Sequence, residues 1–156
     1  MSFSVLMSVY YKDNPIWLKQ AIDSVLNNTI KPNQIVMVVD GQIPTELEQV
    51  LREYKDNLDI LRIEKNSGLG EALQQGLLKC KYSLVARMDS DDISLSNRFE
   101  QQLKEFEGNP NLTIVGGYIQ EFDSQTNEKI SIRKVPLEDN KIKKYISLYY
   151  LHLFYV

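Results

Sequence analysis

Four consecutive residues, Asp89-Ser90-Asp91-Asp92, offer the clearest potential for chemistry in this sequence. Asp89 and Asp91 are two residues apart at the end of an apolar run, so in an extended chain their carboxylates point to the same side. Carboxylates held this close repel one another unless a cation lies between them. Ligands that are all oxygen favour Mg²⁺ or Mn²⁺ over zinc. We therefore expect a divalent metal site at Asp91 and Asp89, with Asp92 as a further candidate; an exposed loop that caps the next helix is the alternative.

Three further polar groups also follow apolar runs. In an open parallel sheet ligands bind beyond the carboxyl ends of the strands, so these segments are where a site is expected. Asp40 is also compatible with a simple Asp-Gly turn. The amides of 66–70 could meet a phosphate or a ribose, or only start a helix, and Arg87 could reach the same pocket or form a salt bridge. The three groups are Tyr10-Tyr11-Lys12-Asp13, Asp40-Gly41 and Asn66-Ser67-Gly68-Leu69-Gly70.

Hydrophobic periodicity predicts the elements that position these groups. Short apolar runs predict strands, and the run at 35–39 is typical of a strand buried on both faces. Apolar residues at helical spacing lie between these runs, with Asn14 and Ser96 as expected caps and Gly76 at a point of close packing. Strict alternation of strand and helix requires a mostly parallel sheet with right-handed connections. The predicted strands are 3–10, 35–39, 59–63 and 82–88, and the helices begin near 15, 45, 69 and 97.

Beyond Pro110 the pattern changes to two strands, 112–122 and 129–135, around a turn. The expected fold is therefore an α/β, Rossmann-like open sheet with flanking helices and an appended C-terminal β-hairpin. Neither a repeat nor a linker interrupts the sequence, so we expect one domain, 1–156.

The composition limits which cellular compartment and which classes of binding partner fit this protein. With 18 Lys and Arg against 21 Asp and Glu, the net charge of −3 argues against nucleic acid, which requires a basic surface. The single cysteine, Cys80, excludes an intramolecular disulfide and fits a reducing cytoplasm. The apolar tail, 145–156, is shorter than the roughly twenty residues of a membrane span. We expect a cytoplasmic protein whose tail is buried in an interface between copies, covers the sheet or contacts the inner face of a membrane.

The polar groups, in this order, resemble the family 2 glycosyltransferases of GT-A fold that build bacterial capsular and exopolysaccharides. The resemblance covers roughly residues 3–136. It implies an inverting, metal-dependent transferase that moves a sugar from a nucleotide-sugar donor, with UDP the expected nucleotide, to a saccharide or lipid-linked acceptor. The metal would stabilise the charge that develops on the departing diphosphate. The segments that carry the resemblance are 8–13, 35–41, 66–68 and 86–94, followed by Arg98, Gln101 and Gln102.

The resemblance also implies roles for single residues. Asp40 would contact the nucleobase and Tyr10 would line its pocket. Asp89 would face the ribose or the donor sugar, and Asp91 would bind the metal that bridges the diphosphate, with Asp92 a candidate for either contact. The full nucleotide-sugar-binding set implied in this way is Tyr10, Asp40, Asn66, Gly68, Arg87 and Asp89.

The sequence departs from the family pattern where the general base is expected, the group that takes the proton of the acceptor hydroxyl. Members of the family supply it from a segment after the hairpin, but only residues 137–156 follow Pro136 here, and 145–156 do not resemble the usual continuation. We therefore expect a C-terminal truncation without the base, and no catalytic residue is assigned. The alternative function is a fragment that binds nucleotide-sugar and metal without transferring the sugar.

Two other enzyme classes gather carboxylates at strand ends. A phosphoryl-transfer domain of the receiver or phosphatase type needs an acidic residue at the end of the first strand, which here ends in Tyr10-Tyr11. A nucleotidyltransferase would show a glycine-rich, arginine-containing loop at that point. Both classes therefore fit less well than the glycosyltransferases. The identities of the sugar, the acceptor and the linkage, and the oligomeric state, are not encoded in any recognisable motif.

Overall fold

The alternation of strands and helices expected from the periodicity is confirmed in a computed structural model, which describes residues 1–138 and 140–142. The expected tail, 145–156, lies outside the described residues. The elements are β1 (Phe3–Val9), α1 (Pro15–Leu26), β2 (Gln34–Asp40), α2 (Thr45–Glu53), β3 (Asp59–Ile63), α3 (Leu69–Leu77), β4 (Leu84–Arg87), α4 (Arg98–Gly108), β5 (Ile119–Phe122) and β6 (Lys129–Arg133).

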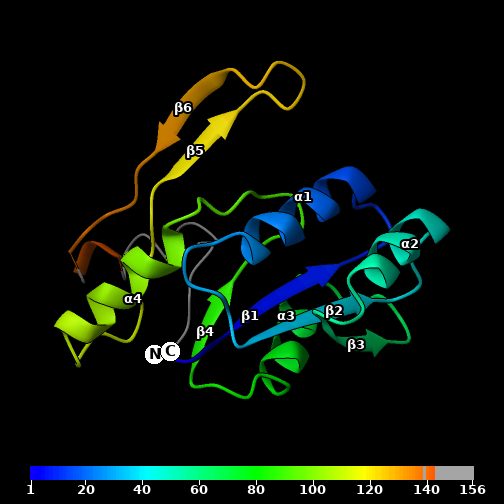
Figure 1. Cartoon of the computed structure of the whole chain (residues 1–156), viewed down its shortest axis with the longest axis horizontal. Coiled ribbons are helices and arrows are strands. Elements are labelled where there is room, and N and C mark those ends of the chain that lie inside the picture. Colours follow the sequence, from blue (N-terminus) through cyan, green and yellow to red (C-terminus); the bar gives the residue numbers. More distant parts are fainter. Residues whose placement is uncertain (139, 143–156) are drawn as a thin grey trace.

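The first four strands form one parallel sheet in the order β3-β2-β1-β4. Strand β2 lies inside the sheet and every residue of it is buried, as its unbroken apolar run predicts. Strand β3 lies at an edge and is partly exposed. Because all four strands run in the same direction, the segments that follow them emerge at one edge of the sheet (Figure 1).

The sheet separates two apolar cores, because successive residues of a strand point to opposite faces. On one face Val5 and Met7 of β1 pack with residues of α1, α2 and α4. On the other face Leu6 packs with Val38 and with Ala72 of α3. Helices α1, α2 and α4 therefore pack on one face of the sheet and α3 packs on the other (Figure 1).

Gly76 lets α3 approach the sheet closely, as the sequence predicts. A Cβ atom at this position would lie 2.5 Å from Cδ1 of Leu6 and 2.6 Å from Cγ2 of Val38. These distances are shorter than any real carbon contact, so a larger residue would push the helix and the strands apart.

Two helix starts show which local signals hold. The Asn14 side chain caps α1 by accepting hydrogen bonds from the Ile16 and Trp17 amides at 2.8 and 3.4 Å. At α4 the expected cap at Ser96 is wrong, because the helix begins one residue later and its N-cap, Asn97, makes no side-chain capping bond. The Ser96 carbonyl instead accepts the Thr29 amide at 2.7 Å, which ties this segment to the end of α1.

Strands β5 and β6 form the expected antiparallel hairpin, which projects from the rest of the molecule (Figure 1). The expected first strand, 112–122, is too long, since residues 112–118 are not extended in a sheet and pairing begins at Ile119. The turn follows Asp123, whose carboxylate accepts the amides of Gln125 and Thr126. Among the described residues, no helix has both the length and the apolar character needed to cross a membrane.

The two glycines of α3 provide a matched test of this packing. Gly76→Ala should lower the free energy of unfolding by about 1–3 kcal/mol through overpacking. Gly70→Ala, where a Cβ meets nothing within 4 Å, should raise it by up to about 1 kcal/mol because alanine favours helix. Urea denaturation followed by circular dichroism measures both. Equal effects of the two substitutions would contradict the close approach of α3 to β1 and β2.

Candidate functional site

Asp40, at the end of β2, organises the first of two polar clusters at the carboxyl edge of the sheet. Its side chain is buried, and both carboxylate oxygens accept two hydrogen bonds each. Oδ1 accepts the Ser67 amide at 2.7 Å and the Ser67 hydroxyl at 3.0 Å. Oδ2 accepts the Gly68 amide at 2.9 Å and Nδ2 of Asn66 at 3.1 Å. The strand end and the loop before α3 therefore form one unit.

Two glycines permit this arrangement. Gly41 has a φ of 83°, and a Cβ there would lie 2.7 Å from the Asn66 nitrogen. Gly68 precedes α3 with a φ of 87°. Both values lie in the left-handed region that favours glycine. The structure thus brings Asp40, Asn66 and Gly68 together, as the sequence predicts, but the Ser67 and Gly68 amides face the Asp40 carboxylate rather than open space.

The second cluster joins the loop after β1 to residues 89–92 after β4, which are called the acidic loop below. Oδ2 of Asp13 accepts the Ser90 hydroxyl at 2.9 Å, across 77 positions of sequence. The same oxygen accepts the Tyr10 amide at 3.1 Å. Downstream, the buried Ser94 accepts a hydrogen bond from Nδ2 of Asn28 at 3.1 Å. The acidic loop is therefore held at both ends by the termini of α1 and its preceding loop.

Two arginines border the acidic loop. Arg87 donates to Asp89 at 2.7 Å, in a pair whose side chains are only 14% and 20% exposed. Its Nε is buried and has no hydrogen-bond partner in the part of the chain that the structure describes. Such an atom normally pairs with a ligand or water, which makes Arg87 a candidate for contact with a bound anion.

Arg98, the first residue of α4, contacts the end of β4. Its guanidinium donates to the Arg87 carbonyl at 3.0 Å and lies 3.1 Å from Sδ of Met88. Burial lowers the pKa of Arg98 to about 10, and the carboxylates of Asp92 and Asp89 partly offset this. The side chain remains charged at neutral pH and attracts the acidic loop. The sequence placed Arg98 only within the family pattern and gave it no role.

Asp13 is the site residue that sequence reasoning did not assign. Burial raises the pKa of its carboxyl, and the nearby carboxylates of Asp91 and Asp89 add to this, against hydrogen bonds from Tyr10 and Ser90. Its position directly after the first strand was visible in the sequence. No spacing rule connects residue 13 with residue 90, however, so the contact could only be found in three dimensions.

The acidic loop fits a divalent cation through the chemistry of its donors, which are all oxygen. Asp91 and Asp92 are exposed, while Asp89 is paired with Arg87. Within residues 1–138 and 140–142, no three acidic, cysteine or histidine side chains are gathered around a common point. A metal held here would therefore take one or two carboxylates and leave positions for phosphate oxygens and water, as Mg²⁺ commonly does.

Tyr10 belongs to this cluster through its amide, which donates to Asp13, and its side chain is exposed. Its side chain is 39% exposed, and its ring meets that of Tyr11 edge to face at 5.5 Å. An exposed aromatic ring on a residue whose backbone is fixed by a hydrogen bond is suited to stacking against a planar ligand.

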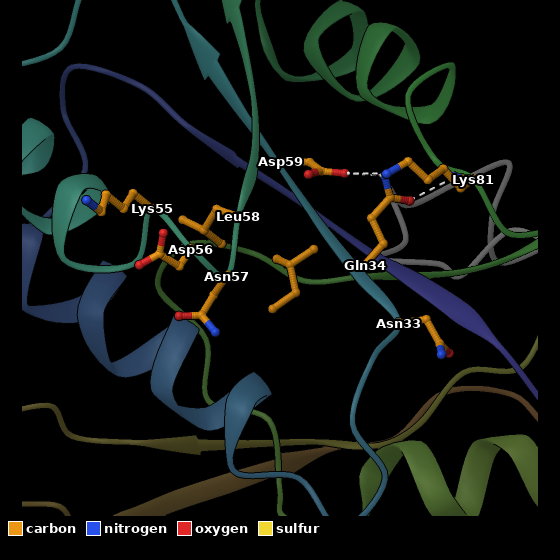
Figure 2. Close-up of a pocket in the computed structure, with 9 residues that line it drawn as sticks. Asn33, Gln34, Lys55, Asp56, Asn57, Leu58, Asp59 and Lys81 are labelled. Carbon is orange, nitrogen blue, oxygen red and sulfur yellow. Dashed lines mark hydrogen bonds and ion pairs between the residues drawn. The ribbon is translucent and has the colours of Figure 1, made fainter.

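A polar cavity of about 250 Å³ lies at the opposite, amino edge of the sheet (Figure 2). Gln34, at the start of β2, lines it on the side of Asp59 and Lys81. Its amide donates to Asp59 at 2.8 Å and to the Lys79 carbonyl at 3.1 Å, and its oxygen accepts from the Ser4 hydroxyl and the Lys81 amide. The hydrogen-bonding capacity of this buried side chain is used by the protein itself, so the cavity serves the fold.

An open parallel sheet with polar loops at its carboxyl edge is the architecture of α/β proteins that bind their ligands there. The sequence profile of glycosyl transferase family 2 matches residues 4–155. The chain belongs to this family.

Two relatives and one solved structure show the range of the similarity. The UDP-Gal:alpha-D-GlcNAc-diphosphoundecaprenol beta-1,3-galactosyltransferase of Escherichia coli is 41% identical over 92% of this chain and 52% of its own length. The amylovoran biosynthesis glycosyltransferase AmsE of Erwinia amylovora is 39% identical over 92% of this chain and 54% of its own. The chain thus spans about half the length of these relatives.

The same fold occurs in the mannosyltransferase PcManGT from Pyrobaculum calidifontis, solved in complex with GDP-Man and Mn²⁺. The two structures align with a TM-score of 0.66 and 14% identity, over 76% of this chain and 35% of the other. This likeness confirms the expected GT-A architecture.

Asp40→Asn tests whether the Asp40 carboxylate shapes the loop before α3. All four groups that contact it are donors, so an amide NH₂ would face at least one donor without an acceptor. The substitution should lower the free energy of unfolding by about 2–3 kcal/mol, whereas Ser67→Ala, which removes one hydroxyl donor, should cost about 1 kcal/mol. Chemical denaturation of the two variants measures the difference, and a smaller loss in Asp40→Asn would contradict the assigned role.

Asp13→Asn tests the electrostatic cost of the second cluster. Because the pKa of Asp13 is raised in the folded protein, its ionisation destabilises the fold as pH rises through that pKa. The asparagine variant keeps an acceptor oxygen without the charge, so it should be more stable than the parent at pH 7 without metal. This advantage should shrink as pH falls to the ordinary carboxyl range. Denaturation midpoints across pH 3 to 7 measure the trend, and a constant difference would contradict it.

Proposed function

We propose that this chain forms the donor-binding part of a metal-dependent, inverting glycosyltransferase that takes its sugar from a nucleotide-sugar. The carrying observation is the acidic loop 89–92, which hydrogen bonds join to the loop bearing Tyr10 at the carboxyl edge of the sheet. UDP is the proposed nucleotide and a saccharide or lipid-linked sugar the proposed acceptor. The name of the Escherichia coli relative, which gives a UDP-sugar donor and a lipid-linked acceptor, supports both choices.

The proposed base site uses Tyr10 and Asp40. The exposed ring of Tyr10 would stack on the nucleobase. The Asp40 carboxylate would fix the loop of Asn66 and Gly68 beside the nucleotide. One of its oxygens would also accept a hydrogen bond from the nucleobase. Its four existing hydrogen bonds support the first of these contributions directly.

The proposed diphosphate site uses the two ends of the β4 loop. Asp91, exposed at the tip, would hold Mn²⁺ or Mg²⁺, with Asp89 or Asp92 as a second ligand. The bound metal would neutralise the charge that develops on the leaving diphosphate. Arg87 would donate its unpaired Nε to the ribose or the diphosphate while its other nitrogen keeps Asp89 in place.

The proposal also concerns the acceptor side of the reaction. We propose that the general base is supplied by sequence equivalent to the half of the relatives that this chain does not span. A fragment that binds nucleotide-sugar and metal without transferring the sugar is the second candidate. Release of UDP that depends on a lipid-linked acceptor would separate the two, since only a complete transferase produces it. We also propose that the protein lies in the cytoplasm, at the inner face of the membrane, and that 1–156 form one domain.

Asp91→Ala tests the donor site by calorimetric titration with UDP. In the parent chain Mn²⁺ should raise the UDP affinity by at least about tenfold, because the metal joins the acidic loop to the diphosphate. Asp91→Ala should remove this gain while its circular dichroism spectrum stays unchanged. Asp56→Ala, at the amino edge of the sheet, is the matched control and should bind as the parent does. A metal-dependent gain that survives in Asp91→Ala would overturn the metal assignment, and titration with GDP and dTDP would identify another preferred nucleotide.

A further inference from the structure

The loop after β1 and the loop after β4 meet through one carboxylate oxygen. Oδ2 of Asp13 accepts both the Tyr10 amide at 3.1 Å and the Ser90 hydroxyl at 2.9 Å. Tyr10 is the residue proposed to stack on the nucleobase, and Ser90 lies between the proposed metal ligands Asp89 and Asp91. A single atom thus lies between the two halves of the donor site.

The backbone around this atom forms a closed turn. The Asp13 amide donates to the Tyr10 carbonyl at 3.1 Å while the Asp13 side chain accepts from the Tyr10 amide. Immediately after it, Asn14 caps α1. The turn 10–13 is therefore fixed at its helical side, and its other contact, with Ser90, decides how firmly Tyr10 is held against the acidic loop.

The charges around Asp13 oppose the contact that its hydrogen bonds make. Asp13 lies near the carboxylates of Asp89 and Asp91, and like charges at such sites repel. The basic groups near the acidic loop, Arg87 and Arg98, face Asp89 and Asp92. The interaction between the two loops is thus weakened by repulsion that a divalent cation would remove.

We infer that Asp13 is a positioning residue that couples the two binding events: through Ser90, a metal ion at the acidic loop strengthens nucleobase binding at Tyr10. The inference rests on the proposed function and goes beyond it, since the metal would otherwise act on the nucleotide only through the diphosphate. A cation near Asp91 and Asp89 relieves the repulsion on Asp13 and favours the closed turn. The base then binds a ring that is already in place, and reciprocity requires that the base also favour the metal.

Uridine separates this coupling from direct bridging. It carries the base and the ribose but no phosphate, so a metal cannot join it to Asp91 through a diphosphate. In the parent chain Mn²⁺ should increase the uridine affinity by about fivefold, a factor typical of coupled sites. The measurement is a uridine titration with and without saturating Mn²⁺, run beside the UDP titration on the same protein.

Four variants locate the route. Ser90→Ala removes one hydroxyl and Asp13→Ala removes the shared acceptor; in both, the uridine affinity should change less than twofold on adding Mn²⁺. Ser90→Thr, which keeps a hydroxyl, should retain the response. Ser96→Ala, an exposed serine in the same connection, is the control for a loss that any serine substitution would cause. Circular dichroism establishes that each variant is folded.

Each outcome bears on one statement. A parent chain that binds UDP with Mn²⁺ but binds uridine equally with and without metal overturns the coupling and leaves the proposed function intact. A full uridine response in Ser90→Ala overturns the route through Asp13. Failure to bind UDP, GDP or dTDP overturns the proposed function, and the inference with it.

Discussion

The parallel pairing of β1 with β2 on one side and β4 on the other is the constraint on which the rest of the structure depends. It brings the ends of three strands to one edge, although they are separated by dozens of residues in sequence. The register is fixed because both faces of β1 are buried, and a shift of one residue would turn Val5 and Met7 away from their core. The contact of Asp13 with Ser90 follows from this alignment, and the contacts of Asp40 with residues 66–68 follow from the further pairing of β2 with β3.

A buried carboxylate, Asp40, and a partly buried one, Asp13, lie at that edge in contrasting environments. Asp40 is fully matched by donors from a single loop, so it stabilises the structure it belongs to. Asp13 is shared between two loops and repelled by neighbouring acids, so it costs stability when ionised. Groups whose environment opposes their charge are concentrated at functional sites. Under the proposed function, Asp40 would provide a rigid support for the nucleotide on the β2–β3 side, and Asp13 would provide an adjustable contact on the β1–β4 side.

Membership of glycosyl transferase family 2 gives this division a chemical meaning. A donor site must hold a base, a ribose and a charged diphosphate that leaves during the reaction. Negative charge develops only on the diphosphate, so only that part of the site must stabilise it. The acidic loop is bordered by Arg87 and Arg98, which offset part of its negative charge. The fold is shared with a mannosyltransferase of 14% identity, which shows how little of the sequence is needed to retain this architecture.

Local sequence determined the elements, because helical and strand periodicities are properties of neighbouring residues: the cap at Asn14, the buried run of β2 and the close packing at Gly76 were all predictable. The acidic loop was also visible as a short string. The prediction from local sequence was wrong where a tertiary contact took over a local role. Ser96 was expected to cap α4, but its carbonyl instead accepts a hydrogen bond from the segment after α1. The strand order, the hub formed by Asp40 and the meeting of Asp13 with Ser90 were decided by tertiary structure. Residues 13 and 90 meet only because two strands pair in parallel, and pairing depends on long-range packing that no local spacing records.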